Sequence, residues 1–279
     1  MFARRIFSKE GMNMKDFFAS EGIEYYRELA AESLTVWNPR LWERAVEKLG
    51  KVESAVLFLI PYFSGQETTD LSVYAQPRDY HLYMKELSLR LESYLAEHYP
   101  DVRAVGYADS SPLAERTCAL RAGLGVLGKN GLFIHPRYGS YVFLGEFLFS
   151  QRFSPCEPLP IKTCLNCGAC ERACPTGAIS DPQRKECLSH ISQKKKWTEA
   201  EALKMQGVSC RWGCDLCQTA CPMNRGAEHT PISFFREGIV SRWTPSLLEE
   251  ENWRERAFSW RGKEVLLRNF GEKTEKKEK

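Results

Sequence analysis

The spacing of the cysteines constrains this chain more than any other feature of its sequence. Nine of the eleven cysteines lie between Cys164 and Cys221. The first four follow the order Cys-x2-Cys-x2-Cys-x3-Cys-Pro and end at Pro175, which is the bacterial ferredoxin pattern. In that pattern three closely spaced thiolates bind one [4Fe–4S] cluster and the fourth reaches a second cluster. The run therefore predicts a partner motif elsewhere in the chain.

The partner motif lies further along the chain, as Cys-x2-Cys-x3-Cys-Pro ending at Pro222. It lacks one position, so a remote cysteine has to complete the count. We expect one cluster on Cys164, Cys167, Cys170 and Cys221. We expect the other on Cys174, Cys214, Cys217 and the remote Cys187, with Cys210 as the open alternative. A zinc ribbon would leave the two Cys-Pro endings unexplained, so two [4Fe–4S] clusters are predicted.

The compartment of the protein bears on what the cysteines do. Residues 4–9 resemble a twin-arginine export signal, but charged and polar residues follow where such a signal needs an apolar stretch. We therefore expect a cytoplasmic protein, with Met12 or Met14 as alternative start sites. No stretch approaches the roughly 18–20 apolar residues of a membrane span, so no membrane contact is expected. In a reducing compartment, clustered cysteines indicate metal binding rather than disulfides.

The residues before the cysteines alternate between helical and extended patterns. Helices are expected over residues 15–50, 79–98 and 115–122, and strands over 52–62, 102–108, 132–135 and 141–149. The apolar run from Ala55 to Ile60 has no alternation, as in a strand covered on both faces. The composition, 43% hydrophobic and 27% charged, is that of a globular protein. The fold class predicted is an α/β domain followed by a bacterial ferredoxin-like domain.

A change in composition divides these two parts. Three prolines between Ser154 and Pro160 indicate a stiff linker. We expect an α/β domain over residues 1–153, a double-cluster domain over 154–230, and a helical C-terminal segment with a charged tail over 231–279. Because two clusters transfer single electrons, the large first domain is expected to hold whatever receives them.

A second candidate site lies in that first domain. Asp109 ends a predicted strand, and a loop with four glycines and Lys129 follows it. Glycines let the backbone approach a large flat or phosphorylated ligand. The alternative is a surface turn with a salt-bridged aspartate, and the loop lacks the order of a Walker motif.

These motifs resemble those of the epoxyqueuosine reductase family. The resemblance is carried by Asp-x-x-Pro-Leu-x-Glu-Arg from Asp109, Ala-Gly-Leu-Gly-x-Leu-Gly-Lys-Asn up to Asn130, Gly-Ser-Tyr-Val-Phe-Leu-Gly-Glu from Gly139, and both cysteine motifs. It covers residues 52–225. The resemblance implies a first domain that binds cobalamin, a fold related to reductive dehalogenases, and reduction of epoxyqueuosine to queuosine at the tRNA wobble position.

The resemblance also implies roles for single residues. Asp109 matches the general acid at the epoxide. The wall facing the corrin is matched by Lys129, Asn130, Phe133, Ser140 and Leu144. The eight cluster ligands match with Cys187 in place rather than Cys210. The family chemistry stages electrons on cobalt, between Co(II) and Co(I), so an external low-potential electron donor is implied. We expect the protein to be a monomer.

The tRNA partner has a candidate contact surface. Residues 184–212 carry seven Lys and Arg against three Glu, although the net charge of the whole chain is only +3. The pairs Lys194-Lys195-Lys196-Trp197 and Arg211-Trp212 combine basic charge with aromatic rings, as phosphate contact and base stacking require. The alternatives in function are a corrinoid reductase of a small molecule and a plain two-cluster electron carrier.

Overall fold

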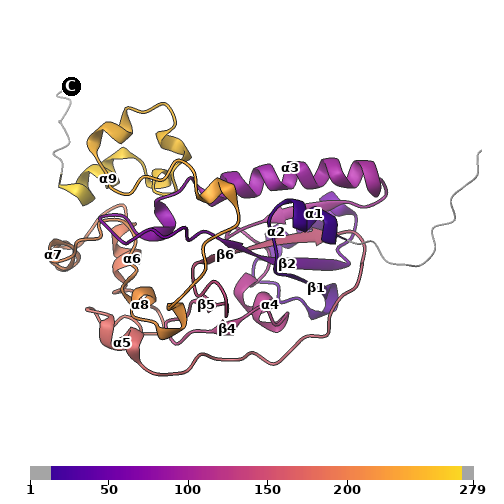
Figure 1. Ribbon diagram of the computed structural model, residues 1–279, viewed down its shortest axis with the longest axis horizontal. Helices are drawn as coiled ribbons and strands as arrows, with labels where there is room; N and C mark the ends of the chain where they lie inside the picture. Colours follow the sequence, from indigo (N-terminus) through magenta and orange to yellow (C-terminus); the bar gives the residue numbers. More distant parts are fainter. Residues whose placement is uncertain (1–13, 272–279) are drawn as a thin grey trace, which may run out of the picture. The chain divides into compact units, whose positions relative to one another are not determined.

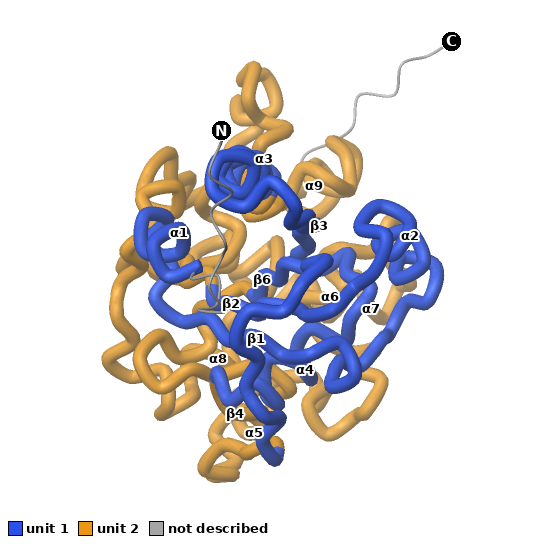
Figure 2. The backbone as a smooth tube through the Cα atoms, turned by 90° about the vertical axis from the view of Figure 1, so that its right-hand side faces the viewer, with its two compact units in different colours: residues 1–59, 85–124, 144–160 blue, residues 60–84, 125–143, 161–279 orange. Residues whose placement is uncertain are grey.

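The computed structural model describes residues 14–271 (Figure 1). The segment that resembles an export signal, the alternative start Met12 and the charged tail from residue 272 lie outside the described residues, whereas Met14 is the first residue described. The chain forms two compact units, coloured separately in Figure 2. Unit 1 comprises Met1–Leu59, Lys85–Leu124 and Leu144–Pro160, and unit 2 comprises Ile60–Met84, Gly125–Phe143 and Ile161–Lys279.

A four-stranded sheet organises unit 1. Its strand order is β1-β2-β6-β3, with β1 Tyr26–Ala30, β2 Ser54–Pro61, β6 Val142–Phe149 and β3 Ala104–Tyr107. β1 pairs antiparallel with β2, and β3 pairs antiparallel with β6. All residues of β2 are buried, as its unbroken apolar run predicted. Figure 2 shows helices α1 and α3 on one face of the sheet and α2 and α4 on the other. These helices are α1 Lys15–Ser20, α2 Pro39–Leu49, α3 Tyr80–His98 and α4 Glu115–Arg121.

The expected helix over residues 15–50 is wrong in its middle, because β1 lies there. Its backbone pairs along the edge of β2, with Tyr26 opposite Phe58 and Ala30 opposite Ser54. The tertiary pairing outweighs the local helix propensity of the Tyr-Arg-Glu-Leu-Ala stretch, in which Arg, Glu, Leu and Ala are all good helix formers. The predicted stop at Gly50 is confirmed, since this residue caps α2 with a φ of 80°.

Aromatic side chains fill the core of unit 1. The rings of Phe58 and Phe147 on neighbouring strands are stacked with centroids 5.1 Å apart, and Phe18 of α1 lies 5.5 Å from Phe58. All three side chains are fully buried. Burying such rings contributes most of the free energy that holds the helices to the sheet.

Unit 2 has little sheet and many short elements. Its only ladder among the described residues is the two-stranded pair of β4 Val126–Leu127 with β5 Phe133–Ile134. Its helices are α5 Ala169–Ala173, α6 Leu188–Ser192, α7 Glu199–Gln206, α8 Leu216–Thr219 and α9 Lys263–Phe270. The stretch after residue 231 contains 3-10 turns at Ser233–Phe235, Pro245–Leu248, Trp253–Glu255 and Ser259–Arg261 before α9. The expected division of the chain at residues 153 and 230 stays a prediction.

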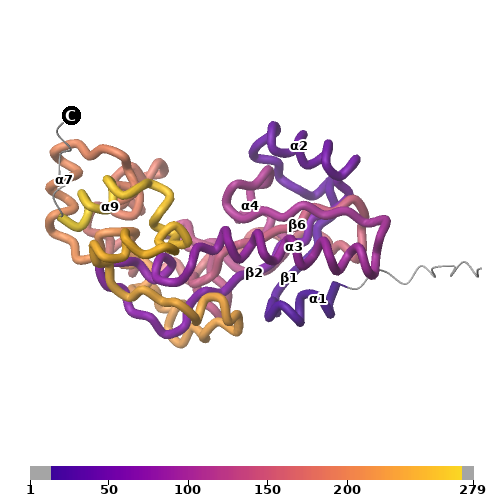
Figure 3. Tube along the Cα trace, turned by 90° about the horizontal axis from the view of Figure 1, so that it is seen from above, coloured from indigo at the N-terminus to yellow at the C-terminus, as the bar shows by residue number. Residues whose placement is uncertain are grey.

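Apolar packing joins distant parts of unit 2. One core cluster brings Leu71 and Trp212 together with Trp243, Phe258 and Leu266 from the C-terminal stretch. Arg268 of α9 donates to the carbonyl oxygens of Lys194 and Lys195, and Figure 3 shows α9 on the same side as α7. None of the helices in residues 14–271 combines the length and apolar character needed to cross a bilayer.

Candidate functional site

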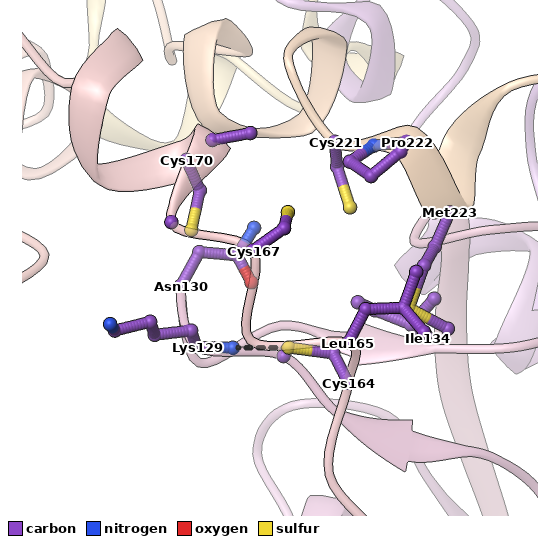
Figure 4. A pocket seen from close by; sticks show the side chains of 13 residues that line it. Lys129, Asn130, Ile134, Cys164, Leu165, Cys167, Cys170, Cys221, Pro222 and Met223 are labelled. Atoms are coloured by element: carbon purple, nitrogen blue, oxygen red, sulfur yellow. Dashed lines mark hydrogen bonds between the residues drawn. The ribbon is translucent and has the colours of Figure 1, made fainter.

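The eight cysteines assigned to clusters are gathered in unit 2 around two separate hollows. The first hollow is lined by Cys164, Cys167, Cys170 and Cys221, together with the loop Gly128 to Asn130. Figure 4 shows the four sulfur atoms around one open space. This is the set that the exchange of cysteines between the two motifs predicted for one cluster.

Local structure explains how widely spaced cysteines meet at the first hollow. Gly168, with a φ of 72°, turns the chain so that α5 begins directly after it, and α5 carries Cys170. Cys221 precedes the turn Pro222–Asn224, and the proline occupies its first position, where the missing N–H costs nothing. The Cys-Pro ending therefore holds the last thiol at the start of a rigid turn.

The second hollow is lined by Cys174, Cys187, Cys214 and Cys217. Cys187 immediately precedes α6, and Cys217 lies on α8. Cys210 is outside this lining; its buried thiol donates to the carbonyl oxygen of Trp212 at 3.2 Å. The structure thus brings Cys187, and not Cys210, to the other three cysteines.

The donor set of each hollow fits an iron–sulfur cluster. All eleven cysteines are free thiols, and four thiolates are what a [4Fe–4S] cluster takes. Burial raises the pKa of the Cys214 thiol to about 11 and that of Cys217 to about 12. Buried thiols of this kind lose their protons when a metal binds. Within residues 14–271, no three His, Cys, Asp or Glu side chains are grouped as a single-ion site.

The five predicted corrin contacts differ in how much of their surface is exposed. Asn130, Phe133 and Ser140 are buried, whereas Lys129 and Leu144 keep part of their surface exposed. Ser140 belongs to a buried network, in which its N–H donates to Asn224 Oδ1 at 2.8 Å and its carbonyl accepts from Gln218 Nε2 at 3.0 Å. The cobalamin roles of these five residues stay predictions.

Asp109 lies at the end of β3 in unit 1 and is exposed. Its φ of 62° is in the left-handed region, which few non-glycine residues adopt and which marks strained or functional turns. Its backbone N–H donates to Glu115 Oε1 at 2.9 Å, and Ser111 N–H donates back to the Asp109 carbonyl at 2.8 Å. These hydrogen bonds fix the backbone of the turn.

Two glutamates lie next to the Asp109 turn: Glu115 is half-buried and Glu146 is fully buried. Burial, with the charge of Glu146 and then Asp109 as smaller causes, raises the pKa of Glu115 to about 8. Burial likewise raises the pKa of Glu146 to about 8, opposed by the hydrogen bond from Ser111. The second oxygen of Glu146 has no partner among the described residues. Both carboxyls are therefore largely protonated at neutral pH.

Both glutamates lie in the motifs that carry the family resemblance, but no role was predicted for either. The available signal was Glu146 itself, an acid inside the otherwise apolar strand Val142–Phe149. Acids are almost never fully buried unless they are paired, so such a position marks a special environment.

The aromatic half of the RNA-contact prediction is wrong. Trp212 is fully buried in the core cluster described above. Trp197 donates its indole N–H to the Ile191 carbonyl at 2.7 Å, and the Arg268 guanidinium lies 3.9 Å from its ring centroid. Both rings are used in packing, so neither offers a free face for a base. Lys195 and Lys196 remain exposed.

Comparison with known proteins agrees with this geometry. Residues 163–224 match the family model of a 4Fe-4S double cluster binding domain. The chain is 35% identical to an epoxyqueuosine reductase of Bacillus anthracis over 203 residues, which are 69% of this chain and 53% of that protein. It is 31% identical to an epoxyqueuosine reductase of Bacillus subtilis over 255 residues, 83% of this chain and 66% of that protein.

The fold agrees as well. A crystal structure of epoxyqueuosine reductase with an epoxyqueuosine-modified tRNA-Tyr stem loop matches with a TM-score of 0.72 at 24% identity, covering 92% of this chain and 78% of that one. The chain spans about half the length of the first of these sequence relatives. The predicted mixed α/β fold with a double-cluster segment is confirmed. Sequence and fold together confirm that this chain is related to the epoxyqueuosine reductase family.

Proposed function

We propose that this chain reduces the epoxide of epoxyqueuosine to give queuosine at the wobble position of tRNA. The observation that carries the proposal is the gathering of eight cysteines into two hollows of four, in a chain whose relatives are named epoxyqueuosine reductases. Removing an epoxide oxygen consumes electrons, and two clusters deliver them one at a time. A tRNA substrate places the reaction in the cytoplasm.

We propose cobalamin as the further cofactor, following the family resemblance. When bound, it would supply a cobalt centre that stages the single electrons of the clusters for a two-electron reduction. Of the predicted contacts, Lys129 and Leu144 have exposed surface, while Asn130, Phe133 and Ser140 are buried within the protein. All five stay proposed contacts, and Lys129 and Leu144 are the two with exposed surface.

Asp109 is the proposed proton donor of the reaction. The epoxide oxygen leaves poorly as an alkoxide, so a positioned acid that protonates it lowers the barrier. Asp109 lies at an exposed position in the left-handed turn. Glu115 holds this turn through the Asp109 N–H, and as a neutral acid it adds little negative charge beside the donor.

The decisive experiment is mass analysis of tRNA nucleosides. A strain that lacks its own epoxyqueuosine reductase accumulates the epoxide, and expression of this chain is expected to replace it with queuosine. Continued accumulation of the epoxide alongside folded, iron-loaded protein would refute the tRNA substrate. A corrin absorption band in the same purified protein separates this enzyme from a plain electron carrier.

The exposed lysines give a test of the tRNA partner. Replacing Lys195 and Lys196 by Glu is expected to weaken binding of an anticodon stem loop and to reduce the salt slope by about one for each lost phosphate contact. Lys194 is unsuitable for this test because it is paired with Glu201. Unchanged affinity and salt slope would remove this patch from the tRNA surface.

A further inference from the structure

The loop Gly128 to Gly131 contacts cysteines of both hollows. It leaves β4 next to the start of the cysteine segment, where the two stretches pair like parallel strands. Leu127 N–H donates to the Lys162 carbonyl at 2.8 Å, and Cys164 N–H donates to the Leu127 carbonyl at 3.0 Å. This short ladder holds the loop against the first cysteine.

The next donor along this ladder bonds to sulfur instead of oxygen. Lys129 N–H donates to Cys164 Sγ at 3.3 Å, which is the dashed line in Figure 4. The bond comes from the backbone, so it is fixed by the ladder and not by the Lys129 side chain. The Lys129 ammonium instead forms an ion pair with Glu171 at 2.8 Å.

The following residue, Asn130, lines the first hollow and also lies near Cys217 of the second. Asn130 is 3% exposed. Its Oδ1 accepts the Leu132 N–H at 3.2 Å and lies where a Cβ on Gly128 would come within 2.4 Å of it, which explains the glycine. The amide is therefore oriented with its nitrogen on the other side. That buried nitrogen has no hydrogen-bond partner among the described residues. The Asn130 side chain lies close enough to Cys217 to oppose the rise that burial causes in the pKa of that thiol.

The loop is also braced from outside. Arg184 donates to the Asn130 carbonyl and, at 3.4 Å, to the Lys129 carbonyl. These two bonds do not involve the cysteines. They fix the backbone that carries the Lys129 N–H and the Asn130 side chain. Donors that are already in place stabilise negative charge on a cysteine ligand, because the loop does not have to move when that charge appears.

We propose that this loop sets the reduction potentials of both clusters, through the Lys129 N–H that donates to Cys164 and through the buried Asn130 amide nitrogen, which has no other partner among the described residues and is a donor available to Cys217. The inference rests on the proposed cluster assignment. Reduction adds negative charge to a cluster and its sulfur ligands, and hydrogen bonds to those sulfurs stabilise the reduced form. The loop therefore raises both potentials and eases entry of electrons. Asn130 acts here as a positioning residue, through the ligand that it contacts.

The test is an EPR-monitored redox titration of the reconstituted full-length chain and its Asn130→Leu variant. Leucine matches asparagine in size but has no donor. We expect the variant to keep all its iron while the reduction equilibrium constant of one cluster falls severalfold to tenfold, tenfold being about 59 mV for one electron. Asn269→Leu is the matched control, because Asn269 is equally buried but donates to the Ser192 and Arg211 carbonyls. Its potentials are expected to stay at the wild-type values.

A second measurement needs no variant. In D2O, pulsed EPR of the wild-type protein is expected to show exchangeable deuterons coupled to each reduced cluster. The loop's role would be overturned if Asn130→Leu kept two intact clusters with unchanged potentials. It would also be overturned if the wild-type clusters were intact but showed no coupled deuterons. Either result would leave the cluster assignment standing. A chain that takes up no iron would overturn both.

Discussion

Burial acts on ionisable groups in both units, but with opposite chemical outcomes. In unit 1 it raises the pKa of the Glu146 carboxyl to about 8, so this group keeps its proton at neutral pH. In unit 2 it raises the pKa of Cys214 to about 11 and that of Cys217 to about 12, yet these thiols face a hollow suited to a cluster and give up their protons when iron binds. Desolvation therefore keeps a carboxyl protonated in unit 1, whereas in unit 2 it keeps thiols protonated only until iron binds.

This comparison predicts that variants in one unit leave the chemistry of the other intact. The largest effect is expected for Asp109→Asn in unit 1. Loss of a general acid costs a factor of about 10² to 10⁴ in turnover, measured with epoxyqueuosine-containing tRNA. Iron content and EPR signals are expected to match the wild type. Near-normal turnover would remove Asp109 from the mechanism.

A variant in unit 2 is expected to do the reverse. Cys187→Ser removes one thiolate from the second hollow and is expected to lower the iron content by about half, one of two clusters being lost. Cys210→Ser is the matched control, because Cys210 is a buried cysteine of the same segment outside both hollows. If the iron content fell in Cys210→Ser and not in Cys187→Ser, Cys210 would be the cluster ligand and Cys187 would not.

The protons held by the buried carboxyls make the free energy of unfolding depend on pH. The folded protein holds a proton on Glu146 between its ordinary pKa of 4.5 and about 8, while the unfolded chain has released it. The free energy of unfolding therefore falls as pH rises through this window, by up to about 1.4 kcal/mol per pH unit for one proton. Glu115 contributes in the same direction.

Glu146→Gln keeps the shape and cannot ionise, so its unfolding free energy is expected to fall less steeply. Urea midpoints between about pH 5 and pH 8 measure the slope. Glu97→Gln, at an exposed position of α3, serves as the control and keeps the wild-type slope. A wild-type slope in Glu146→Gln would show that Glu146 is ionised in the folded protein.

The smallest effect is expected at the surface pair of Lys129 and Glu171. Partly exposed ion pairs contribute little because water and salt screen them. Glu171→Gln is therefore expected to leave thermal stability and both cluster potentials unchanged. A shifted potential would mean that the Lys129 ammonium, and not its backbone N–H, acts on the first cluster.

Patterns with a fixed spacing were predictable from the sequence. The cysteine motifs predicted seven of the eight thiols that line the hollows, and the family resemblance favoured Cys187 over Cys210 for the eighth. The apolar run of β2 predicted its burial. β1 was missed because its identity comes from pairing with β2, a long-range contact that local propensity does not encode. The burial of Trp212 was missed for the same reason, since its partners Trp243 and Phe258 lie far along the chain. The orientation of the Asn130 amide depends on Gly128 and Leu132 and needed coordinates.

The exchange of cysteines between the motifs has a consequence for synthesis. The first hollow takes its last thiol from Cys221, and the second takes thiols from Cys214 and Cys217. A nascent chain that has emerged from the ribosome only as far as residue 200 contains three of the four cysteines of the first hollow and two of the four of the second, so neither site is complete. Metal loading is thus deferred until the segment is nearly finished, and a prematurely terminated product would emerge without any complete binding place for iron.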